Sequence, residues 1–323
     1  GDEARGGGVN GSTVVATDSI IENNSTASRY AHGVGLFANH EITLTSSTLS
    51  GNIAQKGVFG AGANATNLTV RNSTVSENLA SGWDFGGFGG GLFGTDVRVY
   101  ESLIEGNSLG EYGMGGGIKG DEVFIEDSVI RDNRASYGGG VDAEKLWVER
   151  SQIDGNTAFG ANGGGAGGGI LAIRADIFSS SITNNQATGN SYGNSGGGIA
   201  AGGPWGLDIG SALIVNSTIA NNAADAAGGL AGESFELLNT TVTGNTDGIG
   251  KHVGFAESVK LFNSVVAENI GSDINGTVTA RTASLVGGDG RQIFADTEEI
   301  AAGVFAGVPA DNGGPTPTVA LLP

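Results

Sequence analysis

The sequence predicts an all-β protein, a right-handed parallel β-helix of about eleven coils, on the basis of three observations. A short segment recurs along the chain. It is clearest over 97–156, where three copies read apolar, any, apolar, two polar residues, Ser, any, Ile, any, any, Asn. Glycine runs such as 115–117 and 138–140 separate the copies. The composition, with 61 glycines in 323 residues and many Val, Ile, Thr, Ser and Asn, favours strands and turns.

The asparagine that closes each segment fixes the alignment of the copies. Three residues before it the chain always carries Ile, Leu or Val, and five before it Ser or, once, Thr. Eight and ten residues before it stand apolar side chains without a charged exception. A degraded eleventh copy lies near Leu285. The ten closing residues are Asn24, Asn52, Asn78, Asn107, Asn133, Asn156, Asn185, Asn222, Asn245 and Asn269.

Each part of the repeat has a physical role in a stack of coils. The two apolar residues that alternate with polar ones predict a short strand with one buried face. A unit this short cannot form its own core, so identical units must stack, about 4.8 Å apart, to bury a continuous one. We expect the serine at a bend, the asparagine at a turn and in a hydrogen-bonded ladder, and the glycines at tight corners.

Two other solenoids do not fit the pattern. A leucine-rich repeat would place Leu at several fixed positions, and a calcium-binding roll would repeat Gly-Gly-x-Gly-x-Asp. Neither pattern occurs here. The repeats stop near residue 290, so we expect a parallel β-helix over 1–290 and a C-terminal cap or tail over 291–323.

Composition also limits the partners. The net charge of −19 would repel a phosphate backbone and anionic lipid, so we expect no nucleic acid and no membrane insertion. Acidity is compatible with Ca²⁺ binding, and we expect no other cofactor. There is no cysteine, which excludes disulfides and thiolate chemistry. The chain begins Gly1-Asp2-Glu3 without a signal peptide, which we interpret as removed after export.

Two motifs carry a resemblance to known families. The pairing of Ile-x-x-Asn with Gly-Gly-Gly-Ile, Leu or Val resembles the Phe-x-x-Asn and Gly-Gly-Ala-Ile repeats of polymorphic outer-membrane proteins, which are secreted β-helical adhesins. The tail 311–323, Asp-Asn-Gly-Gly-Pro-Thr-Pro-Thr-Val-Ala-Leu-Leu-Pro, is similar to the signature of choice-of-anchor surface proteins. Both resemblances imply an extracellular or cell-surface protein.

The strand positions that point outward suggest two candidate sites. Tyr100, Phe124, Trp147 and Phe178 are predicted to share one face, as a row that could bind a polysaccharide or a protein, although loops that cover the face would bury the same rings. Glu126 and Glu149 are predicted to stack on successive coils beside Arg71 and Arg98. They could form a catalytic pair or a Ca²⁺ site, or simply a solvated ladder with salt bridges.

The remaining candidates are weaker. The three histidines show no metal-binding spacing, and Lys119, a potential base, is expected to be an ordinary surface residue. The tail residues Pro315, Pro317, Leu321 and Leu322 could dock on a neighbouring copy and support a homo-oligomer or polymer. No set of catalytic residues stands out.

We therefore expect an exported structural or adhesive protein without catalytic activity, which could assemble with itself. Two alternatives remain open. A polysaccharide lyase or glycoside hydrolase would use carboxylates on an outward face, and a carbohydrate-binding module would use the aromatic row.

Overall fold

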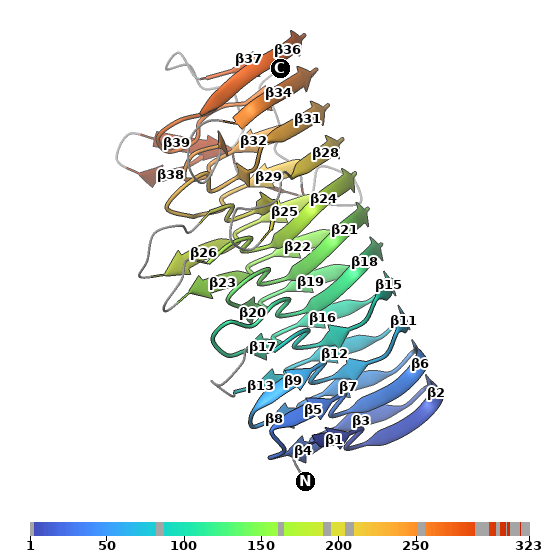
Figure 1. Cartoon of the computed structure of the whole chain (residues 1–323). Helices are drawn as coiled ribbons and strands as arrows, with labels where there is room; N and C mark the ends of the chain where they lie inside the picture. The colour runs from blue at the N-terminus through green and yellow to red at the C-terminus, as the bar shows by residue number, and fades with distance from the viewer. Residues whose placement is uncertain are drawn as a thin grey trace.

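The protein is a parallel β-solenoid in which short strands stack coil upon coil (Figure 1). The computed structural model describes residues 3–81, 87–160, 165–189, 195–203, 210–250, 256–287, 297–301, 304–307, 309–310 and 317. Within these residues all regular structure is strand, as the sequence predicts. The candidate tail residues Pro315, Leu321 and Leu322 lie outside the described residues, and Pro317 is half-buried.

The long sheet, with 16 strands, runs the length of the solenoid along the right of Figure 1. Its strands are β2 (Val9–Thr17), β6 (Leu36–Thr45), β10 (Ala63–Asn64), β11 (Asn67–Arg71), β14 (Leu92–Phe93), β15 (Asp96–Tyr100), β18 (Ile118–Glu126), β21 (Val141–Glu149), β24 (Ile170–Phe178), β27 (Ile199–Ala201), β28 (Ser211–Val215), β30 (Leu230–Ala231), β31 (Ser234–Leu238), β33 (Ile249–Gly250), β34 (Ala256–Phe262) and β36 (Gly276–Thr282).

The second sheet has 11 strands, one from each copy of the repeat. They are β3 (Ile20–Glu22), β7 (Thr48–Ser50), β12 (Thr74–Ser76), β16 (Leu103–Glu105), β19 (Val129–Arg131), β22 (Gln152–Asp154), β25 (Ser181–Thr183), β29 (Thr218–Ala220), β32 (Thr241–Thr243), β35 (Val265–Val266) and β37 (Leu285–Val286).

The third sheet has seven strands and closes the coils of the N-terminal part. They are β4 (Ser25–Thr26), β8 (Ile53–Ala54), β13 (Leu79–Ala80), β17 (Ser108–Leu109), β20 (Arg134–Ala135), β23 (Thr157–Gly160) and β26 (Gln186–Gly189). A small parallel sheet contains β1 (Glu3–Arg5), β5 (Tyr30–His32) and β9 (Gly57–Phe59), and an antiparallel hairpin contains β38 (Thr297–Ala301) and β39 (Val304–Gly307).

The strand register is the one that the repeat predicts. Val97 of β15 lies opposite Val123 of β18, which in turn lies opposite Leu146 of β21. These inward side chains are at most 3% exposed and belong to one continuous core cluster that extends from Val14 to Val266. The stack makes about nine turns, slightly fewer than the eleven predicted.

The asparagines form a ladder inside the solenoid, as predicted. The backbone N–H and the side-chain amide of Asn107 both donate to Oδ1 of Asn133, each at 3.0 Å. Asn133 donates to Oδ1 of Asn156 in the same way, and its amide also donates to the carbonyl of Ile104 at 2.9 Å. The ladder begins at Asn24, and its bonds from one asparagine to the next all donate toward the C-terminal end.

A second ladder, which the sequence reasoning did not predict, contains the serines. The N–H of Ser102 donates to Oγ of Ser128 at 3.1 Å, and that hydroxyl donates to the carbonyl of Glu126 at 2.7 Å. The residue before each ladder serine or asparagine, and not the serine or asparagine itself, adopts the left-handed backbone conformation. Examples are Asp127 (φ 48°) and Asp132 (φ 55°). The expectation that the ladder asparagine itself takes up the turn is therefore wrong: the residue before it does.

The glycine corners lie where the next coil approaches closely. Gly115 and Gly138 have φ of 70° and 57°. A Cβ on Gly117 would stand only 2.7 Å from the carbonyl oxygen of Gly140 on the neighbouring coil. The regular spacing between coils leaves no room for a side chain at this corner, which therefore requires glycine.

The C-terminal coil ends the stack with polar groups. Arg281 stands at an inward strand position, opposite Leu261, but is exposed and donates two hydrogen bonds to the carbonyl of Ser284. The asparagine ladder ends where the Asn269 amide donates to a carboxylate oxygen of Asp273 at 2.8 Å. This arginine interrupts the apolar pattern of the inward positions.

Candidate functional site

Four aromatic side chains form a continuous row on the outer face of the long sheet. Tyr100, Phe124, Trp147 and Phe178 come from β15, β18, β21 and β24, four successive coils. Trp147 is 38% exposed and the other three are half-buried. The sequence placed all four on one face, and the structure brings them into contact.

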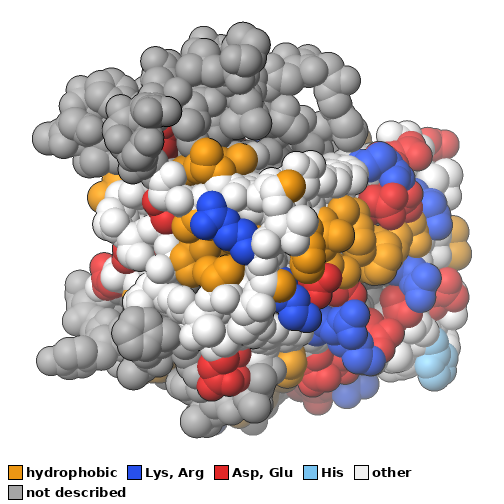
Figure 2. Space-filling view, turned by 90° about the horizontal axis from the view of Figure 1, so that it is seen from above, with side chains coloured by type: hydrophobic (Ala, Val, Ile, Leu, Met, Phe, Trp, Pro, Cys, Tyr) orange, Lys and Arg blue, Asp and Glu red, His pale blue; other side chains and the backbone are white. Residues whose placement is uncertain are grey.

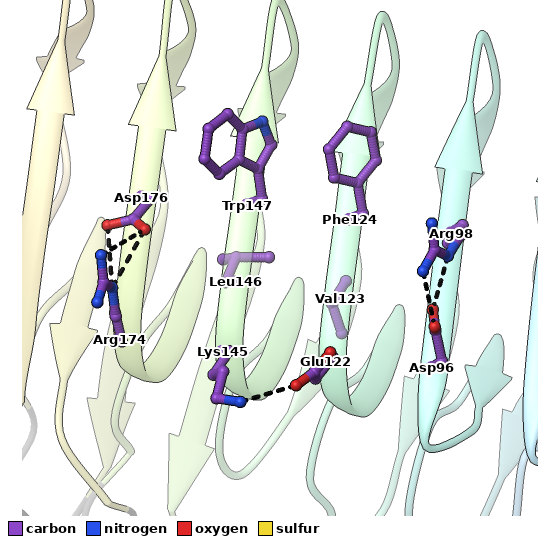
Figure 3. Close-up of a pocket in the computed structure, with 10 residues that line it drawn as sticks. All are labelled: Asp96, Arg98, Glu122, Val123, Phe124, Lys145, Leu146, Trp147, Arg174 and Asp176. Carbon is purple, nitrogen blue, oxygen red and sulfur yellow. Dashed lines mark hydrogen bonds and ion pairs between the residues drawn. The ribbon is translucent and has the colours of Figure 1, made fainter.

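The rings touch from coil to coil. The ring centroids of Tyr100 and Phe124 lie 5.5 Å apart, those of Phe124 and Trp147 6.3 Å, and those of Trp147 and Phe178 4.4 Å. The planes of Phe124 and Trp147 differ by only 13°, and both rings are seen broad face on in Figure 3. The guanidinium of Arg71 covers the ring of Tyr100 at 3.8 Å, which leaves Phe124 and Trp147 as the open centre of the row.

A hollow of about 340 Å³ lies directly beside this row. Phe124 and Trp147 line one side of it (Figure 3). Three ion pairs line the rest: Asp96 with Arg98 at 2.9 Å, Glu122 with Lys145 at 2.7 Å, and Arg174 with Asp176 at 3.0 Å.

The site thus combines flat apolar rings with paired charges. Figure 2, which views the solenoid from above, shows exposed hydrophobic side chains surrounded by both basic (Lys, Arg) and acidic (Asp, Glu) side chains. The sequence reasoning missed most of these charged residues. They stand eleven and nine residues before the ladder asparagine, so one further step back in the same alignment would have found Asp96, Glu122, Lys145 and Arg174.

Glu126 and Glu149 lie opposite each other on β18 and β21, as predicted. Arg150 forms ion pairs with both carboxylates and also with Asp127, where its Nε lies 2.9 Å from Oδ1. Glu149 in addition accepts a hydrogen bond from the indole Nε1 of Trp147 at 3.3 Å. The arrangement is a salt-bridged ladder that holds the indole in place, and the Ca²⁺ site stays a prediction. In the described part of the chain no three His, Asp or Glu side chains gather as metal ligands would.

A buried ion pair lies elsewhere on the long sheet. Lys119 of β18 and Asp142 of β21 pair at 2.8 Å, with side-chain exposures of 16% and 7%. The expectation that Lys119 is a surface residue is therefore wrong. Burial raises the pKa of the Asp142 carboxyl, although the neighbouring ammonium acts in the opposite direction. Its second oxygen has no hydrogen-bond partner among the residues that the structure describes.

A second aromatic cluster lies at the corner of the N-terminal coils. The ring of His32 stacks on Phe59 with centroids 4.8 Å apart, and Phe59 stacks on Phe88 at 5.4 Å. Burial lowers the pKa of His32, which keeps the imidazole neutral near pH 7. These rings pack against one another, and they do not line the hollow beside Phe124 and Trp147.

Comparisons with protein-family models, with curated proteins and with solved structures found no match to this chain. No helix of the described residues is long and apolar enough to cross a membrane. The function must therefore be argued from the geometry of the site.

Proposed function

We propose that this protein is an exported structural and adhesive solenoid of the cell surface, without catalytic activity, that attaches to its partner through the aromatic row. The observation that carries the proposal is the row itself. Four rings touch across four coils on an outward face, and two of them border a hollow. Exposed aromatic groups gathered in this way mark contact surfaces.

The neighbouring carboxylates favour binding over catalysis. A glycosidase needs one carboxyl group to donate a proton and a second to act as base or nucleophile. Here Asp96, Glu122 and Asp176 each hold an arginine or lysine, and Arg150 holds Glu126 and Glu149. Engaged carboxylates of this kind position neighbouring side chains and supply hydrogen bonds to a ligand.

The surface location rests on the resemblances of the repeat and of the tail 311–323. A rod of stacked coils is rigid along its axis because every coil is hydrogen-bonded to the next. Such a rod displays a binding face at a fixed distance from the surface that carries it.

Adhesion of the intact chain to immobilised polysaccharides and matrix proteins tests the proposal. Trp147→Ala should reduce adhesion to whichever surface the wild-type protein binds, whereas Tyr112→Ala should not. Tyr112 is a matched control because it is 50% exposed and takes no part in the row. Equal adhesion by both variants, or turnover of a polysaccharide by the wild type, would contradict the proposal.

Self-assembly is a separate part of the proposal and has its own test. Electron microscopy of the purified protein over a range of concentrations should show filaments or lattices if copies associate. Dispersed short rods at every concentration would contradict self-assembly into a polymer but would not contradict the proposed adhesive function.

A further inference from the structure

The charges that line the hollow cancel one another, which is unusual in a chain of net charge −19. Arg98, Lys145 and Arg174 supply three positive charges, and each is paired with a carboxylate that also lines the hollow. An anionic ligand would meet no excess of positive charge, and a cationic ligand would find no free carboxylate. The balanced charges that line the hollow therefore favour an uncharged ligand.

The same residues offer many hydrogen-bonding groups at the edge of an apolar surface. Arg98 and Asp176 flank Phe124 and Trp147 in the same register across the strands, with their partners Asp96 and Arg174 beside them, and the Glu122–Lys145 pair lies below the two rings in Figure 3. A pyranose ring has this dual character, because its axial C–H groups form an apolar face while its hydroxyls radiate from the edge. Paired charges can donate to and accept from hydroxyl groups without a net charge on the ligand.

The hollow is elongated along the solenoid. Its lining residues come from β15, β18, β21 and β24. Four strands at about 4.8 Å spacing extend over roughly 14 Å, enough for several sugar units in line. The rings repeat at the spacing of the coils, so a ligand that lies across the strands, parallel to the solenoid axis, meets an apolar platform more than once.

From these three features we infer that the hollow binds an uncharged, extended polysaccharide that runs along the solenoid axis. Sugar faces lie on Phe124 and Trp147, and the hydroxyls bond to the ion pairs of Asp96, Glu122 and Asp176. The inference rests on the proposed function and adds the class of ligand and its direction.

The test compares two probes on the intact protein by isothermal titration calorimetry. Neutral β-1,4-linked glucose oligomers should bind with an affinity that does not change between low and physiological salt, because no ion pair forms with the ligand. Galacturonic acid oligomers of the same length should bind at least ~10-fold more weakly. Trp147→Ala should weaken glucose-oligomer binding ~10-fold or more, and Tyr112→Ala should leave it unchanged.

An experiment that neutralises the carboxylates tests the role of the charge balance. The triple variant Asp96→Asn, Glu122→Gln, Asp176→Asn removes the three carboxylates and leaves their cationic partners in place. It should gain affinity for the galacturonic acid oligomers, with a marked dependence on salt. No such gain would contradict the role assigned to the charge balance.

The outcomes separate this inference from the proposed function. If the wild type binds only the acidic oligomers, or only a protein, and Trp147→Ala abolishes that binding, the row is an attachment site and the ligand class is wrong. If Trp147→Ala and Tyr112→Ala bind every probe equally, both the proposed function and the inference fail.

Discussion

Two rows of side chains repeat along this solenoid, one inside and one outside, and they differ in extent. The asparagine ladder occupies every coil from Asn24 to Asn269, whereas the aromatic row occupies four coils, from Tyr100 to Phe178. Each ladder asparagine bonds to backbone groups that would otherwise be buried without partners, so the fold requires it. Nothing in the backbone requires an aromatic ring on the outer face. The contrast suggests that the inner row serves folding and the outer row serves binding.

The largest expected effect is on the inner row. Asn133→Ala removes the acceptor for two donors of Asn107 and leaves the carbonyl of Ile104 without its bond. With about 1–3 kcal/mol for each of these three buried groups left unpaired, the free energy of unfolding should fall by about 3–9 kcal/mol. Urea denaturation followed by circular dichroism measures it.

The end of the ladder provides the control. Asn24 donates to Asn52 but accepts from no preceding asparagine among the described residues. Asn24→Ala should therefore cost only about 1 kcal/mol. Equal losses for Asn24→Ala and Asn133→Ala would show that burial of the ladder contributes little.

The buried ion pair should follow next in size. Asp142→Ala leaves the ammonium of Lys119 largely buried without its carboxylate, and should cost about 3 kcal/mol. The double variant Lys119→Met, Asp142→Leu removes both charges and should lie within about 1 kcal/mol of the wild type or above it. Thermal or urea unfolding of the two variants distinguishes a broken pair from an absent one.

The pH dependence checks the same pair. The pKa of Asp142 is raised above its ordinary value of 3.8, so the folded protein binds the proton more tightly than the unfolded chain. Between 3.8 and the folded value, this group makes the free energy of unfolding fall as pH rises. The slope should disappear in the double variant, and a slope of the opposite sign would show that the ammonium outweighs burial.

The outer row should contribute less to stability than the inner row. Trp147→Ala removes a ring that is 38% exposed and should cost about 1–2 kcal/mol, less than Asn133→Ala, while it abolishes most binding. A loss of stability as large as that of Asn133→Ala would contradict the conclusion that the inner row serves folding and the outer row serves binding. The measurement pairs urea unfolding with the adhesion assay on the same preparations.

The smallest expected effect concerns the charges beside the row. The Arg150 guanidinium lowers the pKa of the Asp127 carboxyl. Its stabilising contribution is therefore present above the unfolded value of 3.8 and is lost as pH falls through the lower folded value. Asp127 is exposed, so Asp127→Asn should cost only a few tenths of a kcal/mol at pH 7. A loss above about 1 kcal/mol would mean that the Arg150 cluster supports the fold rather than the indole alone.

The sequence pattern was sufficient for the fold because the repeat itself encodes strand, face and stacking. Val97, Val123 and Leu146 alternate with outward residues, and the structure pairs them in that register. It was sufficient for the aromatic row for the same reason. The hollow escaped prediction because four of its six charged residues, Asp96, Glu122, Lys145 and Arg174, lie one position before the pattern that was counted.

Other features depend on contacts that a periodic pattern does not contain. Left-handed backbone at Asp127 and Asp132 depends on how the chain leaves each strand. The burial of Asp142 depends on packing at the corner, and the pairing of Arg150 with Glu126 and Glu149 depends on a side chain that reaches across coils. Arg281 is a charged residue at a strand position that is apolar in the other coils. Its position could not be assigned from the sequence because β36 pairs with β34 in an irregular register.

The single direction of the asparagine ladder has an electrical consequence. In every bond between ladder asparagines the amide N–H donates toward the C-terminal end, and each Oδ1 accepts from the N-terminal side, so the side-chain dipoles add along the axis instead of cancelling as strand dipoles do. The positive end of this array meets the Asp273 carboxylate, and its negative end is the Oδ1 atom of Asn24. The solenoid therefore carries a built-in axial polarity, as an α-helix does, but one generated by its side chains.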